Sequence, residues 1–157
     1  MKFPKITELE SHFGKIQIGQ DGRPTPNWEA RHLTLMNLPY AMRLSWRPET
    51  TIRRIRVARA ISGSLSNVLH GIKDLYTPEQ IKALGLDLFG QAYNFSMNCS
   101  GLSVHSFGVA FDINPDKYSA KPDMPEEVIE IFGNEKWAWG GSFKKNPAYH
   151  TFAAVSL

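Results

Sequence analysis

The sequence predicts an α+β fold in which a small antiparallel sheet packs against helices. Capping signals and apolar spacing indicate helices in four stretches of the chain, and two short runs near residues 109–113 and 149–155 have the pattern of β-strands. Segments of both kinds in one chain of this size favour helices packed on a sheet. With 157 residues, 42% of them hydrophobic, the chain has the size of one ordinary domain, and we expect residues 1–157 to form a single unit.

The N-terminal part is expected to hold one short helix followed by irregular chain. Thr7 and Glu10 have capping-box spacing, which predicts a helix that begins within residues 5–9 and ends near Gly14. Residues 19–28 read GQDGRPTPNW, and a stretch this rich in Gly, Pro and Asn predicts an extended loop lying over the core.

The main core helix is predicted over residues 50–74, with Gly63 as the point where it could bend. Apolar residues recur there at spacings of three, four and seven, which is the pattern of an amphipathic helix. Those positions are Ile52, Ile55, Leu65, Val68, Leu69 and Ile72. The same segment carries Arg53, Arg54, Arg56 and Arg59, which we interpret as a solvated helix face rather than as a binding surface.

Two shorter helices follow. Thr77, Pro78 and Gln80 provide an N-cap, a proline at the first helical position and a capping-box partner, and Gly85 can end that helix. The second helix shows the same signals in the order Asp123, Pro125, Glu126 and Gly133.

The two predicted strands bring polar residues together. Residues 109–113 alternate between small or polar and bulky apolar side chains, which predicts a half-exposed strand with Asp112 on its open face. Residues 149–155 form a second β-like run. If the two strands pair, His150 lies beside Asp112.

Composition excludes several kinds of protein. Cys99 is the only cysteine, so the chain can form neither an internal disulfide nor a cage of thiolate ligands. The opening MKFPKITELESHF places charges where a signal peptide needs apolar residues, and no run of about 18 apolar residues occurs. We therefore expect a soluble protein made in the cytoplasm without a signal peptide or a membrane span. The net charge of +3 fits an anionic partner such as the bacterial cell wall or nucleic acid. Of these two we expect the cell wall and no nucleic acid.

The residues that can carry chemistry concentrate late in the chain. Residues 103–112 read Ser-x-His-x-x-Gly-x-Ala-x-Asp, and Trp-Gly-Gly at 139–141 and His150 follow. This pattern resembles the VanY-like D-Ala-D-Ala carboxypeptidases and the phage endolysins that act as L-alanyl-D-glutamate peptidases. The resemblance extends from residue 90 onward and, more faintly, over residues 46–72. It implies a fold of the hedgehog/D-Ala-D-Ala-peptidase type with a zinc ion, and it implies that His105, Asp112 and His150 are the metal ligands.

The residue types support the same assignment. Two imidazoles and one carboxylate form a known catalytic zinc set that leaves a fourth position for water. Ser103 is a candidate for orienting a ligand or the substrate. Trp137 and Trp139 are candidates for the wall of a substrate groove, with core packing as the alternative for both. The other histidines, His12, His32 and His70, lack such neighbours in the sequence.

The chain departs from the family at two places. The family usually carries a carboxylate three residues before the last His, where it acts as general base, and here that residue is Pro147. Asn146 and Glu135 remain as candidates, although an amide cannot accept a proton at neutral pH. The family also tends to carry an Arg before the Ser-x-His motif, and residues 94–98 contain none. The catalytic base therefore stays unassigned. Loss of a general base or of an oxyanion donor costs about two or more orders of magnitude in rate, which argues for a catalytically silent domain.

Three functions remain in competition. The first is a zinc peptidase that cleaves a stem-peptide bond of bacterial peptidoglycan by zinc-activated water, as a phage lysin or a cell-wall remodelling enzyme, acting after release or as part of a phage particle. The second is a catalytically silent domain of the same fold that binds cell wall or serves as a phage structural component. The third is a cysteine peptidase that uses Cys99 with His105 or His150, and it is disfavoured because Cys99 has no clear cationic neighbour in the sequence. The sequence leaves the oligomeric state and the cleaved bond open, and a monomer is favoured.

Overall fold

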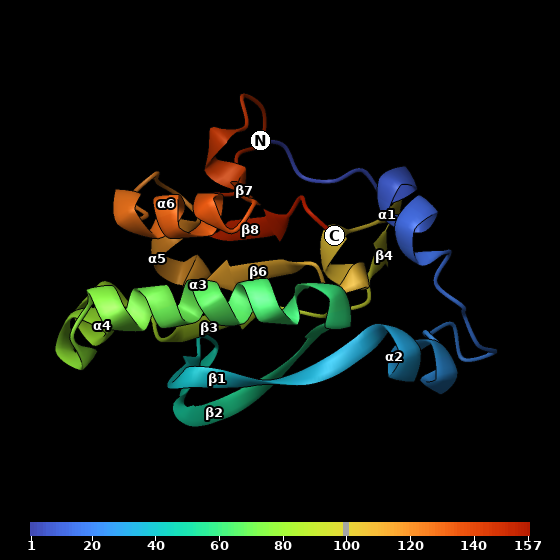
Figure 1. The fold of residues 1–157 in the computed structure, drawn as a ribbon, viewed down its shortest axis with the longest axis horizontal. Coiled ribbons are helices and arrows are strands. Elements are labelled where there is room, and N and C mark those ends of the chain that lie inside the picture. The colour runs from blue at the N-terminus through green and yellow to red at the C-terminus, as the bar shows by residue number, and fades with distance from the viewer. Residues whose placement is uncertain (99–100) are drawn as a thin grey trace.

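A computed structural model describes residues 1–98 and 101–157 and shows the predicted α+β fold (Figure 1). Its centre is a six-stranded sheet in the order β2-β1-β3-β6-β8-β7. Neighbouring strands are antiparallel except for the parallel pair β1 and β3. The strands are β1 (Leu33–Leu44), β2 (Arg47–Ala58), β3 (Leu88–Gln91), β6 (Ala110–Ile113), β7 (Trp137–Trp139) and β8 (Thr151–Ala154). A separate two-stranded ribbon is formed by β4 (Met97–Asn98) and β5 (Gly101–Leu102).

The helices are α1 (Ile6–Phe13), α2 (Pro26–His32), α3 (Ser62–Leu75), α4 (Pro78–Leu84), α5 (Pro115–Tyr118) and α6 (Glu126–Asn134). The 3₁₀ turns among the described residues are η1 (Arg59–Ile61), η2 (Val104–Phe107) and η3 (Gly140–Ser142). Helix α3 contacts both β1 and α6, and α6 contacts β7, so the two helices lie together against the sheet (Figure 1). None of the described helices is long and apolar enough to cross a membrane.

Helix α1 occupies the predicted range, but its cap differs from the prediction. The carboxylate of Glu8 accepts a hydrogen bond from the backbone N–H of Lys5 at 2.8 Å, so Lys5 is the N-cap residue. The predicted pair Thr7 and Glu10 lies inside the helix.

Residues 19–28 were predicted to be entirely loop, and their C-terminal end is instead helical. The side chain of Thr25 accepts a hydrogen bond from the backbone N–H of Trp28 at 3.2 Å, and Pro26 occupies the first turn of α2. A threonine N-cap followed by proline is a helix-start signal, which the high Gly and Pro content of this stretch concealed.

The predicted helix over residues 50–74 is wrong in its first half. Residues 47–58 form β2, which pairs antiparallel with β1 in a register that places Ile55 opposite Met36. Ile55 and Val57 are buried while Arg54 and Arg56 are exposed, which is the period of two expected of a strand. The arginines of this segment are exposed as predicted, but they lie on a strand and η1 rather than on a helix.

The second half of that prediction is confirmed. Helix α3 begins at Ser62 and buries Leu65, Val68, Leu69 and Ile72 completely. Gly63 therefore lies in the first turn, where the predicted bend has no place.

The capping signals hold fully at α4 and partly at α6. Thr77 Oγ1 accepts from the backbone N–H of Gln80 at 3.2 Å, the reciprocal bond is 2.9 Å, and Gly85 ends the helix in the left-handed conformation. Helix α6 instead has Pro125 as its N-cap residue, without a side-chain cap, and it continues past Gly133 to Asn134. The predicted roles of Asp123 and Gly133 are therefore wrong.

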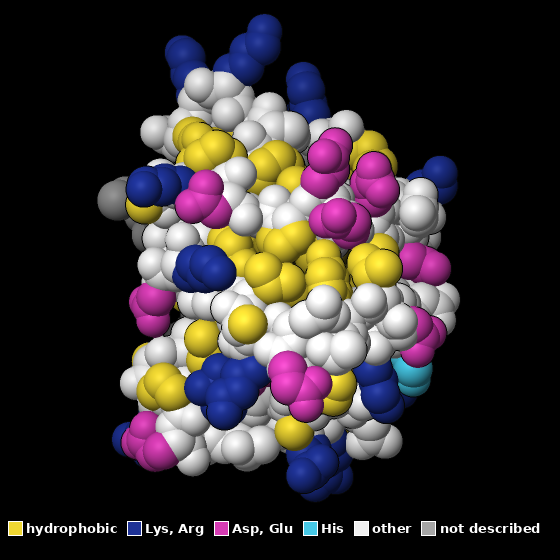
Figure 2. All heavy atoms as spheres, turned by 90° about the vertical axis from the view of Figure 1, so that its left-hand side faces the viewer, with side chains coloured by type: hydrophobic (Ala, Val, Ile, Leu, Met, Phe, Trp, Pro, Cys, Tyr) yellow, Lys and Arg dark blue, Asp and Glu magenta, His cyan; other side chains and the backbone are white. Residues whose placement is uncertain are grey.

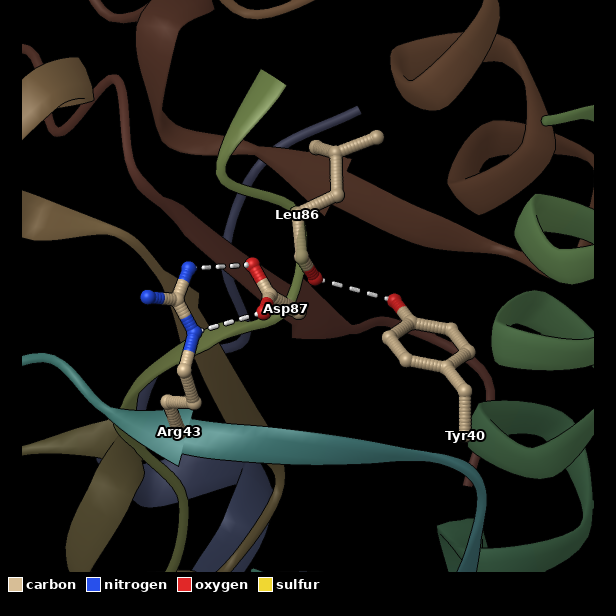
Figure 3. Close-up of polar contacts among 4 residues, drawn as sticks. All are labelled: Tyr40, Arg43, Leu86 and Asp87. Atoms are coloured by element: carbon tan, nitrogen blue, oxygen red, sulfur yellow. Dashed lines mark hydrogen bonds and ion pairs between the residues drawn. The ribbon is translucent and has the colours of Figure 1, made fainter. Parts of the chain in front are cut away.

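Side-chain hydrogen bonds from β1 hold the residues just before β3 (Figure 3). Arg43 on β1 donates to both carboxylate oxygens of Asp87, from Nε at 2.7 Å and from Nη2 at 3.0 Å. The hydroxyl of Tyr40 donates to the carbonyl of Leu86 at 3.0 Å. A bidentate Arg–carboxylate pair has a defined geometry, and it sets the start of β3, which in turn pairs with β6.

The face that lies on the α4 side of the molecule combines hydrophobic and charged surface. Figure 2 shows hydrophobic side chains at its centre, surrounded by Lys, Arg, Asp and Glu. A cleft of about 360 Å³, whose walls include Tyr40, Tyr76 and Ile81, lies between β1 and the helices α3 and α4.

Candidate active site

Strands β6 and β8 bring Asp112 and His150 together. The strands pair antiparallel with Asp112 opposite Thr151, so His150 stands directly before the paired residue. His150 Nε2 lies 3.7 Å from Asp112 Oδ2, and the predicted juxtaposition is confirmed. The predicted open face is wrong, because Asp112 is only 6% exposed. Strand β6 lies inside the sheet and both of its faces are covered, so all four of its residues are buried.

His105 reaches the same carboxylate from the 3₁₀ turn η2. Its Nε2 lies 3.0 Å from Asp112 Oδ1, and His105 is 8% exposed. The turn ends at Gly108, whose φ is +70° and whose carbonyl accepts from the backbone N–H of Ala58 at 2.9 Å. A Cβ at position 108 would stand 2.7 Å from the nitrogen of Ala58. Glycine at position 108 therefore allows η2 to pack closely against the end of β2.

The segment after β3 fixes the His105 ring and its backbone. The carbonyl of Ala92 accepts from His105 Nδ1 at 2.9 Å, and the backbone N–H of Asn94 donates to the His105 carbonyl at 3.1 Å. Two further bonds join Ser96 to the hydroxyl of Ser106. No residue pattern signals this support, because the group that orients the ring is a backbone carbonyl that any residue has.

The hydrogen bond to Ala92 determines which nitrogen carries the proton. A carbonyl can only accept, so Nδ1 of His105 is protonated and, in the neutral ring, Nε2 presents its lone pair to Asp112. Asp112 Oδ1 is buried and has no hydrogen-bonding partner in the described residues, and the same holds for Nδ1 of His150. The 3.0 Å approach of Nε2 is thus a contact without hydrogen-bond geometry.

The surroundings change the proton affinity of His105. Burial lowers the pKa of the ring, but the Asp112 carboxylate and the Ala92 carbonyl outweigh burial and raise the pKa above its ordinary value. A buried carboxylate oxygen without a partner is costly. The contact between Nε2 and Oδ1 is therefore a position where positive charge, from a proton or a cation, is stabilised.

The three predicted ligands are in contact as two pairs that share Asp112. Within residues 1–98 and 101–157, however, no group of three or more His, Cys, Asp and Glu side chains is arranged so that it could hold a metal ion. The structure thus shows the pairing of the candidate ligands and does not show a metal centre.

Trp137 is part of the core rather than of a groove. It is 1% exposed, it packs edge-on against Phe132 of α6, and its indole N–H donates to Ser64 of α3 at 2.9 Å. The register places Trp137 opposite Ala154, one residue out of step with the pair of Ala138 and Ala153. Because side chains alternate along a strand, Trp137 projects toward α3 and α6.

Trp139 lies on that same helical face, two residues along β7 and opposite Phe152. Asp112 pairs with Thr151, one residue before Phe152, so it projects to the other face of the sheet. Core packing, the alternative named for both tryptophans, is what the structure shows for Trp137, whereas Trp139 is half-buried and its role in a groove stays a prediction. The Trp139 indole N–H donates to the Tyr149 carbonyl at 2.8 Å.

The glycines after Trp139 have a structural reason. A Cβ at Gly140 would stand 2.5 Å from the carbonyl oxygen of Ala148, and one at Gly141 would stand 2.1 Å from the Trp139 ring. The Trp-Gly-Gly motif therefore closes the turn between β7 and β8 and supports His150 indirectly.

The remaining candidates lie apart from Asp112 or make other contacts. Glu135 accepts a hydrogen bond from Asn67 of α3 at 3.5 Å, so its carboxylate is directed toward the helices. Asn146 is exposed in the turn before β8, with a φ of 48°, and Pro147 follows it. Ser103 is half-buried just before η2, and its carbonyl accepts from the backbone N–H of Ser106. Cys99 lies outside the described residues.

Comparison with known proteins matches the chain to a family model. A family model described as D-alanyl-D-alanine carboxypeptidase matches residues 98–152, roughly a third of the chain. The matched segment contains all of His105, Asp112 and His150 and supports the resemblance to cell-wall peptidases over the part of the fold that carries the site. Neither the curated proteins nor the solved structures include a match.

Proposed function

We propose that this protein is a zinc-dependent peptidase that cleaves a stem-peptide bond of bacterial peptidoglycan, with His105, Asp112 and His150 as the zinc ligands. The family match points to a peptidase of the D-alanyl-D-alanine carboxypeptidase type. The observation that carries the metal is the unpaired Oδ1 of Asp112, which faces the lone-pair nitrogen of His105.

The spacing of the donor atoms supports this choice of ligands. With bonds of about 2.0–2.1 Å and tetrahedral angles, two ligands of one zinc ion lie about 3.4 Å apart. The two contacts of Asp112, at 3.0 Å and 3.7 Å, lie on either side of that value. The His105 contact uses Oδ1 and the His150 contact uses Oδ2, so side-chain rotations would be needed to bring all three residues onto one ion. A bond from the second ring nitrogen to a carbonyl, as His105 has, is the usual support of a metal-binding histidine.

The residues around the site would serve the reaction in defined ways. Bound zinc would supply a Lewis acid and a water made more acidic than bulk water. His105 would keep a fixed orientation through Ala92, β6 would hold Asp112, and the start of β8 would hold His150 beside it. None of these residues is assigned the role of general base. The proposed setting is the cell wall, reached after release or as part of a phage particle.

The second candidate is a catalytically silent domain that binds cell wall or serves as a phage structural component. A specific observation favours it: the position of the family base is Pro147, and the carboxylate of Glu135 is bonded to Asn67 of α3. A site with metal but without a base would bind the substrate and turn it over very slowly.

One experiment separates the two candidates. Untagged protein would be analysed for bound metal, and the same sample would be followed for new amino groups released from purified peptidoglycan. The test variant is His105→Ala, and the matched control is His70→Ala, an exposed histidine on α3 whose Nδ1 contacts the Ser66 carbonyl. About one zinc per chain with release that His105→Ala abolishes would support the peptidase. Zinc without release would favour the silent domain, and no zinc in the wild type would overturn the ligand assignment.

A further inference from the structure

A second cavity, of about 520 Å³, lies between the end of α1 and helix α2. It belongs to the N-terminal part of the fold, outside the segment that the family model matches. Its volume falls within the range of small-molecule sites. The residues that give it its chemical character are His12, Phe13, Lys15, Trp28, Arg31 and His32.

The lining of this cavity is positively charged. Lys15 and Arg31 are cationic at neutral pH, and no Asp or Glu is among the lining residues. Neither cation forms an ion pair within the part of the chain that the structure describes. One guanidinium nitrogen of Arg31 donates to the neutral side chain of Gln17 at 3.0 Å, which orients the group without cancelling its charge. The cavity therefore favours an anion.

The wall of the cavity is aromatic. The ring of His32 stacks on Trp28 at 4.4 Å between centroids, and Phe13 meets His32 edge-on at 4.6 Å. Burial lowers the pKa of His32 in spite of its bond to the Phe107 carbonyl, so the ring is neutral near pH 7. Planar rings beside cations suit a ligand that joins an apolar or ring-shaped part to an anionic group.

The aromatic wall is joined to the turn that carries His105. His32 Nε2 donates to the carbonyl of Phe107 at 2.6 Å, and Trp28 lies edge-on to the Phe107 ring at 6.5 Å. Phe107 is the last residue of η2, two positions after His105. The turn η2 thus connects the cavity with the candidate active site.

We propose that this cavity binds a free carboxylate of the peptidoglycan stem peptide, held by Lys15 and Arg31, while the adjoining apolar part of the ligand packs on the aromatic wall. The identity of the ligand rests on the proposed function, whereas the anion-binding character rests on the lining alone. A site next to η2 would hold the polymer close to His105 and so increase the time that a scissile bond spends there.

The test is a binding measurement that does not depend on hydrolysis. Soluble disaccharide–peptide fragments, prepared from peptidoglycan with a muramidase, would be titrated into chelator-treated protein by calorimetry, in their acidic form and after amidation of their carboxylates. The variant Lys15→Gln/Arg31→Gln removes the two cations. Lys73→Gln/Lys82→Gln is the matched control, because it removes two exposed lysines near α4 and changes the net charge equally. Thermal melts would confirm that both variants fold.

We expect the acidic fragment to bind at least about tenfold more tightly than the amidated one, and the cavity variant to lose that preference, since a charge-assisted hydrogen bond contributes about tenfold or more. The control should keep it. Equal binding of the two fragments, or an unchanged cavity variant, would overturn the proposal. Tighter binding of a single-stranded DNA oligonucleotide through the same two residues would also overturn it and assign the cavity to nucleic acid. Charge-dependent binding by a protein that, as purified and before chelator treatment, holds no zinc would uphold the cavity and overturn the proposed zinc ligands.

Discussion

Replacing Gly108 by Ala should destabilise the protein by about 3 kcal/mol. The φ of +70° costs an L-residue about 1–2 kcal/mol. The new Cβ would also stand 2.7 Å from the backbone nitrogen of Ala58 and 3.1 Å from a methyl group of Leu33. A backbone atom cannot rotate away, so the end of β2 must shift, and such overpacking costs about 1–3 kcal/mol. For a chain of this length, about 3 kcal/mol lowers the Tm by roughly 6–12 °C.

Two other glycines separate the contributions to this loss. Gly22 has a φ of +75° with nothing within 4 Å of an added Cβ, so Gly22→Ala carries the conformational cost alone, about 1–2 kcal/mol. Gly63 lies in helix α3, also with nothing within 4 Å, and Gly63→Ala should be neutral or stabilise by up to about 1 kcal/mol. The three variants would be compared by urea and thermal unfolding.

From the most to the least stable variant, the order should be Gly63→Ala, then Gly22→Ala, then Gly108→Ala. The reasoning would be refuted if Gly108→Ala and Gly22→Ala were equally stable, because the approach of η2 to β2 would then impose nothing on the side chain at position 108.

Three further predictions follow from contacts described above. Trp137→Phe removes the bond to Ser64 and should cost about 1 kcal/mol in urea unfolding; since Trp137 faces the helices, a change in metal content would contradict its placement. Burial lowers the pKa of His32 in the folded state, so the contribution of the neutral ring to the free energy of unfolding is fully present above about pH 6.5. This contribution is lost as the pH falls. The Tm of the wild type should therefore fall more steeply from pH 7 to pH 5 than that of His32→Gln, and parallel curves would exclude this source. Thr77→Ala removes the N-cap of α4 and should lower the stability by about 1 kcal/mol in the same assay, with an unchanged midpoint as the contrary result.

The parts of the fold that were predicted correctly have their signals close together in the sequence. Helix α4 is specified by a threonine cap, a proline and a glycine within nine residues, and each makes the expected contact. The juxtaposition of Asp112 and His150 required only that two short β-like runs pair, which they do.

The hairpin of β1 and β2 was missed because its signals conflict. Pro39 lies inside β1, and proline argues against a strand interior. The pairing is irregular between Asn37 and Met42, where the ladder accommodates it. On the partner strand β2, Ile52 and Ile55 are three residues apart, a spacing that fits a helix. The alternation of buried and exposed side chains along β2 is evident only from its pairing with β1.

The candidate active site likewise combines features that the sequence predicts with features that depend on the tertiary structure. The pattern in the sequence grouped His105 with Asp112, but the burial of Asp112 depends on which strands flank β6, and this is a property of the whole sheet. The carbonyl of Ala92 and the direction of Trp137 likewise depend on tertiary packing rather than on residue type.

The arginines of β2 have a consequence for the behaviour of the protein in solution. The sheet ends at β2 on one side and at β7 on the other, and β7 is only 3 residues long whereas β2 has 12. A long edge strand offers unpaired backbone groups to other chains, and charged side chains along it discourage such pairing. Arg53 and Arg54 are exposed on this edge. Mutual repulsion between these arginines on neighbouring molecules would keep the longest open edge of the sheet from nucleating aggregates.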